Sequence, residues 1–218
     1  MGLDRTHTAL GAVLVASVML AACSLNPKED PTRYYVLSSI AEDPSLYADA
    51  GLSGSTLEEA IESAGPQLDI SFGVGPITLP SYLKRSRMVT REAGNELRFH
   101  ETERWGEPMP EGVQNTLTEN LGLLATGRLL LHPWYSTQAP DYSVALDVVR
   151  FERDSTGTVT FSGRWEIFDR EGQPVASSPF MDERPPASDS FVGSVSAQSA
   201  QLAALSLQIA DALRQAGS

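Results

Sequence analysis

Two neighbouring segments, 142–153 and 158–169, constrain the fold of this chain more than any other feature of its sequence. In the second segment apolar and polar residues alternate, which is the period-two pattern of a strand with one buried and one wet face. The four residues between the segments, Asp-Ser-Thr-Gly at 154–157, are typical of a tight turn. The two segments are therefore predicted to form an antiparallel hairpin. A second turn at 170–173 predicts a further strand near 175–180.

Two other segments have apolar residues spaced three or four apart, which is the spacing of one face of an α-helix. The first helix is predicted to begin at Pro110 and to end at Gly127, with a stripe of Val113, Leu117, Leu121 and Leu124. The second is predicted over 190–215, with a stripe of Leu202, Leu205, Ile209 and Leu213. We interpret the second stripe as core packing; a lipid-binding groove is the alternative.

Shorter patterns complete the predicted fold. Further strands are predicted at 33–39, 68–74, 88–92, 96–100 and 128–132, the last of them buried. Pro76 and Pro80 are expected to break the strand that precedes them. Segment 41–66 is rich in Ala, Gly, Ser and acids and is interpreted as a surface insertion, with a short capped helix at 55–62. The prediction is a single two-layer α+β domain over 34–216, whose mostly antiparallel sheet is packed by two main helices.

The start of the chain has the pattern of an export signal. Residues 9–22 carry no charge, and as a helix they would span about 21 Å, short of the roughly 30 Å of a bilayer core. That length is typical of a signal peptide, predicted here over 1–22. The stretch ends in Leu-Ala-Ala directly before Cys23, the only cysteine of the chain. This resembles the lipobox of bacterial lipoproteins, in which the cysteine sulfur receives diacylglycerol and the new amino terminus is acylated.

The lipobox resemblance implies a lipidated Cys23 followed by a flexible polar tether, together covering 23–33. Two or more acyl chains make such an anchor effectively permanent. Ser24 rather than Asp follows the cysteine, which by analogy with proteobacterial sorting rules favours the periplasmic face of the outer membrane. The net charge of −12, unchanged by loss of the signal peptide, argues against a nucleic-acid partner. With no second cysteine, the mature chain has no intramolecular disulfide.

No catalytic set is found in the sequence. His100 and His132 are the two histidines of the mature chain, whereas a zinc site usually needs three or four converging ligands. The glycine-rich stretch at 72–76 lacks the Gly-Lys-Ser/Thr of a phosphate-binding loop. We therefore predict a protein that is not an enzyme, with no catalytic residue, no metal site and no cofactor.

The middle of the chain carries a series of unusual motifs. They are Tyr-Tyr-Val-Leu at 34–37, Val-Gly-Pro-Ile-Thr-Leu-Pro-Ser-Tyr-Leu at 74–83, Met-Val-Thr-Arg at 88–91, Arg-Trp-Gly-Glu-Pro-Met at 104–109 and Glu-Asn-Leu at 119–121. In this order they resemble the PqiC-like auxiliary lipoproteins of ABC-type transport systems, associated with paraquat-inducible and other MCE-domain operons. The Lys-Arg-Ser-Arg stretch at 84–87 is more basic than the family pattern, and Met88 and Met109 replace branched aliphatic residues.

The resemblance implies a function without chemistry. The chain would be the outer-membrane lipoprotein of an MCE/ABC-type envelope transport system for lipids or hydrophobic compounds, acting as a docking or receiving subunit. Its implied partners are a periplasmic MCE-domain protein, integral membrane or ABC components and the membrane itself; a homo-oligomer is left open. The alternatives are a lipid-binding carrier domain and an envelope-integrity lipoprotein unconnected to transport.

The motif residues divide into two groups. Those expected to set the backbone path are Gly75, Pro76, Leu79, Pro80 and Pro108. Candidates for partner binding are Tyr82, Leu83, Arg91, Arg104, Trp105 and Glu107. Trp105 is either a core aromatic or an exposed anchor. Tyr82 and Leu83, beside three cations, form either a contact patch for an acidic partner or lipid headgroups, or an ordinary amphipathic turn.

Overall fold

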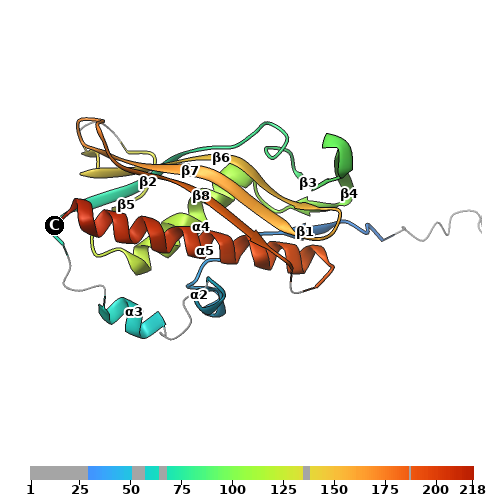
Figure 1. The fold of residues 1–218 in the computed structure, drawn as a ribbon, viewed down its shortest axis with the longest axis horizontal. Coiled ribbons are helices and arrows are strands. Elements are labelled where there is room, and N and C mark those ends of the chain that lie inside the picture. Colours follow the sequence, from blue (N-terminus) through green and yellow to red (C-terminus); the bar gives the residue numbers. More distant parts are fainter. Residues whose placement is uncertain (1–28, 51–56, 64–67, 135–137, 187) are drawn as a thin grey trace, which may run out of the picture. The chain divides into compact units, whose positions relative to one another are not determined.

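The computed structural model describes residues 29–50, 57–63, 68–134, 138–186 and 188–218. The chain divides into two compact units, Met1–Pro31 and Thr32–Ser218. The predicted signal peptide and Cys23 lie outside the described residues. The elements of the second unit, drawn in Figure 1, are β1 (Arg33–Tyr35), α2 (Ser45–Asp49), α3 (Leu57–Ser63), β2 (Ser71–Thr78), β3 (Arg87–Arg91), β4 (Leu97–Trp105), α4 (Met109–Leu124), β5 (Arg128–Leu130), β6 (Tyr142–Asp154), β7 (Val159–Asp169), β8 (Pro174–Arg184) and α5 (Phe191–Ala216).

The eight strands form one mixed sheet in which β6 is the central strand. The order is β1-β4-β3-β6-β2-β5, and β7 and β8 continue the sheet from β6. Because β7 pairs with β6 along nearly its whole length, β2 and β3 share the other edge of β6. The pairs β3/β4, β6/β7 and β7/β8 are antiparallel and hold most of the paired residues, while β1/β4, β2/β5, β2/β6 and β3/β6 are parallel. The α+β prediction is confirmed, with a mixed sheet.

The hairpin of β6 and β7 is formed as its alternation predicts. The dry face of β7 consists of Val159, Phe161, Trp165 and Ile167, all of them buried. Phe161 packs against Phe151 of β6 and Phe180 of β8, with ring centroids 4.5 and 5.1 Å apart. The turn at 154–157 is closed by Asp154, whose side chain accepts hydrogen bonds from the backbone N–H groups of Thr156 and Thr158.

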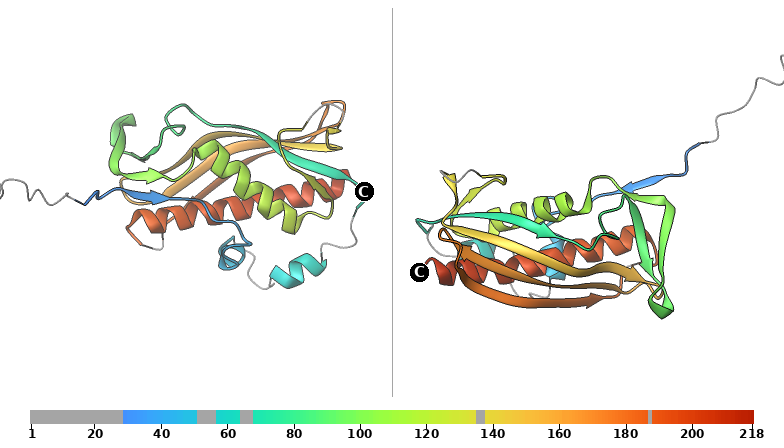
Figure 2. Two further views of the ribbon diagram at one scale, coloured as in Figure 1. Left: turned by 180° about the vertical axis from the view of Figure 1, so that it is seen from behind. Right: turned by 90° about the horizontal axis from the view of Figure 1, so that it is seen from above.

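Helices α4 and α5 cover one face of the sheet. They pack against each other, α4 also contacts β2, and α5 also contacts β7 and β8, so both lie on the same side of the strands (Figure 2). The predicted stripes of both helices are buried. Ser190 caps α5 by accepting a hydrogen bond from the Gly193 N–H.

Strand β2 differs from its prediction because it continues through Pro76. The register with β6 shifts between Val74 and Ile77, so this stretch holds one extra residue, which is a β-bulge. Gly75 has φ of +138°, a conformation open to glycine, and a Cβ there would come within 3.1 Å of the His132 ring. The side chain of Gln114 donates to the Val74 carbonyl at 3.0 Å. Pro76 is therefore accommodated at an irregular point inside the strand and does not end it.

Two further expectations are corrected by burial. The strand predicted as buried at 128–132 is the short edge strand β5, and the adjacent Leu131 is 72% exposed. Segment 41–66 is not wholly a surface insertion, because α2 places Leu46 and Tyr47 in the core against α5. The helix predicted at 55–62 is present as α3 over Leu57–Ser63, while its predicted capping residue Ser55 lies outside the described residues.

Candidate functional site

Two motif residues meet at a buried carboxylate that the sequence analysis did not single out. Tyr82 comes from the turn after β2, Arg91 ends β3, and both contact Glu152 near the end of β6. Glu152 is 1% exposed. Its Oε1 accepts from Arg91 Nε at 2.6 Å and from Arg150 Nε at 3.2 Å; its Oε2 accepts from the Tyr82 hydroxyl and from the Phe151 N–H, both at 2.9 Å. These four donors satisfy the carboxylate, as a buried charge requires. We call this set the Glu152 cluster.

The cluster keeps the Tyr82 hydroxyl protonated. Burial, and after it the neighbouring Glu152 carboxylate, raises the pKa of Tyr82 to about 12. The Arg91 guanidinium also lies 5.8 Å from the centre of the Tyr82 ring, within range of a cation–π contact. The neutral Tyr82 phenol, which donates to the Glu152 carboxylate, therefore serves to position the turn after β2.

The consequence of the cluster is that the turn at 79–86 is held against the sheet. Leu79 and Leu83 are buried, and the turn is closed by a hydrogen bond from the Leu83 N–H to the Pro80 carbonyl at 3.0 Å. Lys84 and Arg85 remain exposed, and the Arg85 guanidinium lies 5.0 Å from the centre of the Phe99 ring. The cluster therefore presents two cations outward on an otherwise acidic protein.

A second buried carboxylate, Glu103, organises the Tyr-Tyr motif. It accepts hydrogen bonds from the Tyr35 hydroxyl and pairs with Arg33 at 3.1 Å. Burial, and after it the bond to Glu103, raises the pKa of Tyr35. The Gly106 N–H donates to the Tyr35 carbonyl at 2.7 Å, so β1 is fastened to the end of β4 by both side chain and backbone. We call Glu103, Tyr35 and Arg33 the Glu103 cluster.

The remaining partner-binding candidates separate by burial. Trp105 is 8% exposed and belongs to the core, so the interpretation as an exposed anchor is not supported. Leu83 is buried as well, which also removes it from an outer contact surface. Arg104 and Glu107 are partly exposed: Arg104 donates to the Glu101 carbonyl, and Glu107 accepts from the Asn115 side chain at 3.2 Å. The structure thus leaves Arg104 and Glu107 open to solvent.

The Glu-Asn-Leu motif is explained by Asn120, which is fully buried in α4. Its Oδ1 accepts from the Ile40 N–H at 2.8 Å, and its Nδ2 donates to the Ser206 hydroxyl of α5 at 3.2 Å. Pro108 provides the N-cap of α4, and its carbonyl accepts from the Gly112 N–H at 3.0 Å. Asn120 joins the chain after β1 to both helices, and Pro108 begins α4, so each has a structural role.

The described residues give no sign of a metal centre. No group of three or more His, Cys, Asp or Glu side chains among them is placed to hold a metal ion. His100 bonds to the Thr90 hydroxyl at 2.8 Å, and burial lowers the pKa of its ring below the ordinary value. His132 stacks edge-on against Trp134. No helix in this part of the chain has both the length and the hydropathy of a membrane span.

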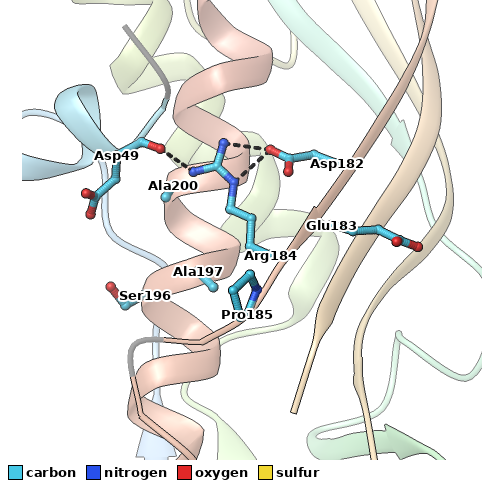
Figure 3. Close-up of a pocket in the computed structure, with 8 residues that line it drawn as sticks. All are labelled: Asp49, Asp182, Glu183, Arg184, Pro185, Ser196, Ala197 and Ala200. Carbon is cyan, nitrogen blue, oxygen red and sulfur yellow. Dashed lines mark hydrogen bonds and ion pairs between the residues drawn. The ribbon is translucent and has the colours of Figure 1, made fainter. Parts of the chain in front are cut away.

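A pocket of about 500 Å³ lies between β8, α2 and α5 (Figure 3). Arg184 crosses it: its Nε donates to the Asp182 carboxylate at 2.8 Å, and its Nη1 donates to the Asp49 carbonyl at 2.5 Å (Figure 3). Glu183 and Ser196 also line the pocket. The lining mixes these charged and polar groups with Pro185, Ala197 and Ala200, whereas a site for an acyl chain is lined predominantly by apolar side chains.

Comparison with known proteins assigns the chain to a family. A family model described as ABC-type transport auxiliary lipoprotein component matches residues 52–210. This chain therefore belongs to the ABC-type transport auxiliary lipoprotein component family, as its motifs predict. No curated protein matches it in sequence.

Solved structures share the fold. One, titled only as an uncharacterized protein, aligns with a TM-score of 0.59 and 24% identity over 67% of this chain and 93% of its own. A Xanthomonas campestris protein of the DUF330 family aligns with a TM-score of 0.58 and 19% identity, over 66% of this chain and 83% of its own.

Proposed function

We propose that this protein is the outer-membrane lipoprotein of an MCE/ABC-type envelope transport system that moves lipids or other hydrophobic compounds. It is held on the periplasmic face by acyl chains on Cys23 and serves as a docking or receiving subunit without catalysis. Membership of the auxiliary lipoprotein family is the observation that carries this proposal. Its partners are a periplasmic MCE-domain protein and the membrane-embedded and ATP-hydrolysing components of the same system.

The geometry of the motifs supports a docking role. Tyr82 and Arg91 are used to fix the turn at 79–86 against β6, so their polar groups are already satisfied by Glu152. The fixed turn presents Lys84 and Arg85. A preorganised loop loses little conformational freedom on binding, which favours recognition of an acidic surface on a partner. The proposed contact surface therefore consists of Lys84 and Arg85, with Arg104 and Glu107 as further candidates.

Lipid anchoring is tested by Cys23→Ser. The variant has no sulfur to acylate, so we expect it in the soluble periplasmic fraction, whereas the parent protein sediments with outer membranes. Mass spectrometry of the parent protein should find a mature chain that begins at residue 23 and carries acyl mass. A variant that still fractionates with membranes would contradict the proposed anchor.

Docking is tested by charge reversal of the proposed contact surface. Lys84→Glu with Arg85→Glu should weaken capture of the purified MCE-domain protein of the same system, and more so at low salt. Arg164→Glu is the matched control, because Arg164 is an exposed cation on β7. Equal capture by both variants would remove this surface from the proposal.

Two further outcomes would favour the alternative functions. Lipid retained by the purified domain in native mass spectrometry would favour the carrier alternative. Failure of the parent protein to capture any component of the system would favour an envelope-integrity role.

A further inference from the structure

Three exposed apolar side chains gather at one groove of the domain. The groove lies between β1 with the residues that follow it and the first turns of α5, and has a volume of about 280 Å³. Tyr34, Val36 and Val192 line it and are 65%, 54% and 65% exposed. They are three of the eight large apolar residues found exposed in the described part of the chain. Figure 1 shows β1 beside the beginning of α5.

The rim of this groove is built on a rigid base. Tyr35, which follows Tyr34, is held by Glu103 and lies 6.2 Å from the Phe191 ring at the start of α5. Leu46 and Val195 line the groove and are buried. In β1, Tyr34 pairs with Arg104 of β4, and the next residue, Tyr35, is held by Glu103. These two contacts fix the outward position of the Tyr34 side chain.

We infer that this apolar rim rests in the headgroup region of the bilayer to which the protein is anchored. The inference rests on the proposed lipidation of Cys23. Nine residues separate Cys23 from Arg33, the first residue of β1, so the ten chain steps between them span at most about 36 Å. The anchor therefore keeps Tyr34 within one short tether of the membrane surface.

The chemistry of the rim fits a lipid surface. Tyrosine favours the membrane–water interface, where its ring meets apolar groups and its hydroxyl meets water, and valine contributes apolar area. Arg33, beside Tyr34, has a side chain that is 72% exposed; its Nη2 pairs with Glu103 at 3.1 Å, and its other N–H groups can meet lipid phosphate. The net charge of −12 gives no general attraction to anionic lipid, so the contact depends on these few residues.

The lipid anchor explains how a rim of only three apolar side chains can keep contact with the membrane. Three side chains bury too little apolar area to recruit a free protein to a bilayer. Tethering makes the second contact intramolecular, with an effective concentration in the millimolar range for a short linker. The lipid anchor and the rim together thus fix the orientation of the domain, with the turn at 79–86 held on the same sheet as β1.

The test uses the full lipidated protein in vesicles of phosphatidylethanolamine and phosphatidylglycerol. Because acylation consumes Cys23, Val192→Cys supplies the only free thiol, which is labelled with a polarity-sensitive fluorophore. Contact with the bilayer should shift its emission to the blue, and brominated acyl chains in the vesicles should quench it. Leu131→Cys is the matched control. Leu131 is 72% exposed and directly follows β5, which stands at the opposite end of the strand order from β1. Its label should stay unquenched.

The fluorescence measurement tests the membrane contact of the rim, and a separate flotation measurement tests the lipid anchor. Equal emission from the two labels would overturn the inference, and so would a blue shift at position 192 without quenching, because a protein surface would then cover the rim. Val36→Cys repeats the measurement at a second exposed position in case Val192→Cys does not fold. Flotation of the parent protein with the vesicles checks the anchor separately. A parent that does not float overturns the proposed lipidation and the inference with it.

Discussion

The two buried carboxylates of this domain have similar partners in different surroundings. Glu152 and Glu103 each accept a hydrogen bond from a tyrosine of a sequence motif and each pair with an arginine. The Arg91 side chain, bound to Glu152, is only 26% exposed, whereas the Arg33 side chain, bound to Glu103, is 72% exposed. Glu152 also has a second arginine and a backbone N–H.

This difference indicates what each cluster can contribute. A charge pair in contact with water is screened and adds little to stability, while a shielded carboxylate depends on every donor around it. The Glu152 cluster therefore contributes, with the buried Leu79 and Leu83, to holding the turn at 79–86 on β6. The Glu103 cluster, by contrast, holds a three-residue strand at the edge of the sheet that pairs with β4 alone, so fewer contacts of the sheet depend on it.

Replacing each glutamate by glutamine should separate the clusters most clearly. In Glu152→Gln the negative charge that pairs with Arg91 is lost, and the new amide NH₂ faces N–H donors or the Tyr82 hydroxyl, the one neighbour that could turn to accept from it, so we expect the free energy of unfolding to fall by about 3 kcal/mol. In Glu103→Gln the Arg33 side chain can turn to water, and the expected loss is about 1 kcal/mol. Urea unfolding of the purified proteins measures both values. Equal losses would show that burial of the arginine partner does not set the contribution.

The Glu152 cluster should lose stability at alkaline pH because of Tyr82. Tyr82 has an ordinary pKa of 10.0 in the unfolded chain and a raised pKa of about 12 in the folded protein. A raised pKa means that the stabilising contribution of the neutral phenol is present below pH 10 and is lost as pH rises toward 12. Phenolate beside Glu152 would also repel the carboxylate. The melting temperature should therefore fall between these two pH values.

Tyr82→Phe is the variant that checks this reasoning. It should lower the melting temperature near neutral pH by less than Glu152→Gln does, because Glu152 loses only one of its four donors and the other bonds of the Tyr82 hydroxyl, to Arg91 and to the Val149 carbonyl, are long at 3.3 and 3.4 Å. It should also flatten the alkaline decline. Tyr35→Phe serves as the comparison, since burial and Glu103 raise the pKa of Tyr35 in the same direction. If the decline persists unchanged in Tyr82→Phe, another group is responsible for it.

The regular part of the fold could be predicted because periodicity and burial agree there. Strands β6 and β7 and both main helices follow from spacing alone, since every second or every third to fourth residue meets the same core. The period-two alternation does not predict that Glu152 is buried. The register of β6 against β7 shifts between Val148 and Arg150, and after that shift the alternation no longer tells which face a residue occupies.

The candidate site could be predicted only in part, for a chemical reason. Tyr, Arg and Trp are enriched both in protein interfaces and in buried polar clusters, so composition alone cannot assign Tyr82, Arg91 or Trp105 to one of them. The motifs identified the residues that matter, and the structure shows that most of them act inward. The exposed rim at Tyr34 and Val192 joins residues far apart in sequence, and no local pattern relates them.

The smallest expected effect concerns Arg33, and it completes the comparison. Arg33→Ala should cost less than about 1 kcal/mol, and the loss should vanish as salt is raised, because an exposed ion pair is screened within a Debye length of about 10 Å at 0.1 M. Arg91→Ala should cost more and keep its cost in salt, since Glu152 would lose its shortest bond in a site that water barely reaches. Urea unfolding of both variants at low and high salt measures the difference. A salt-sensitive loss in Arg91→Ala would mean that solvent enters the Glu152 cluster, and the turn at 79–86 would then be free to leave β6.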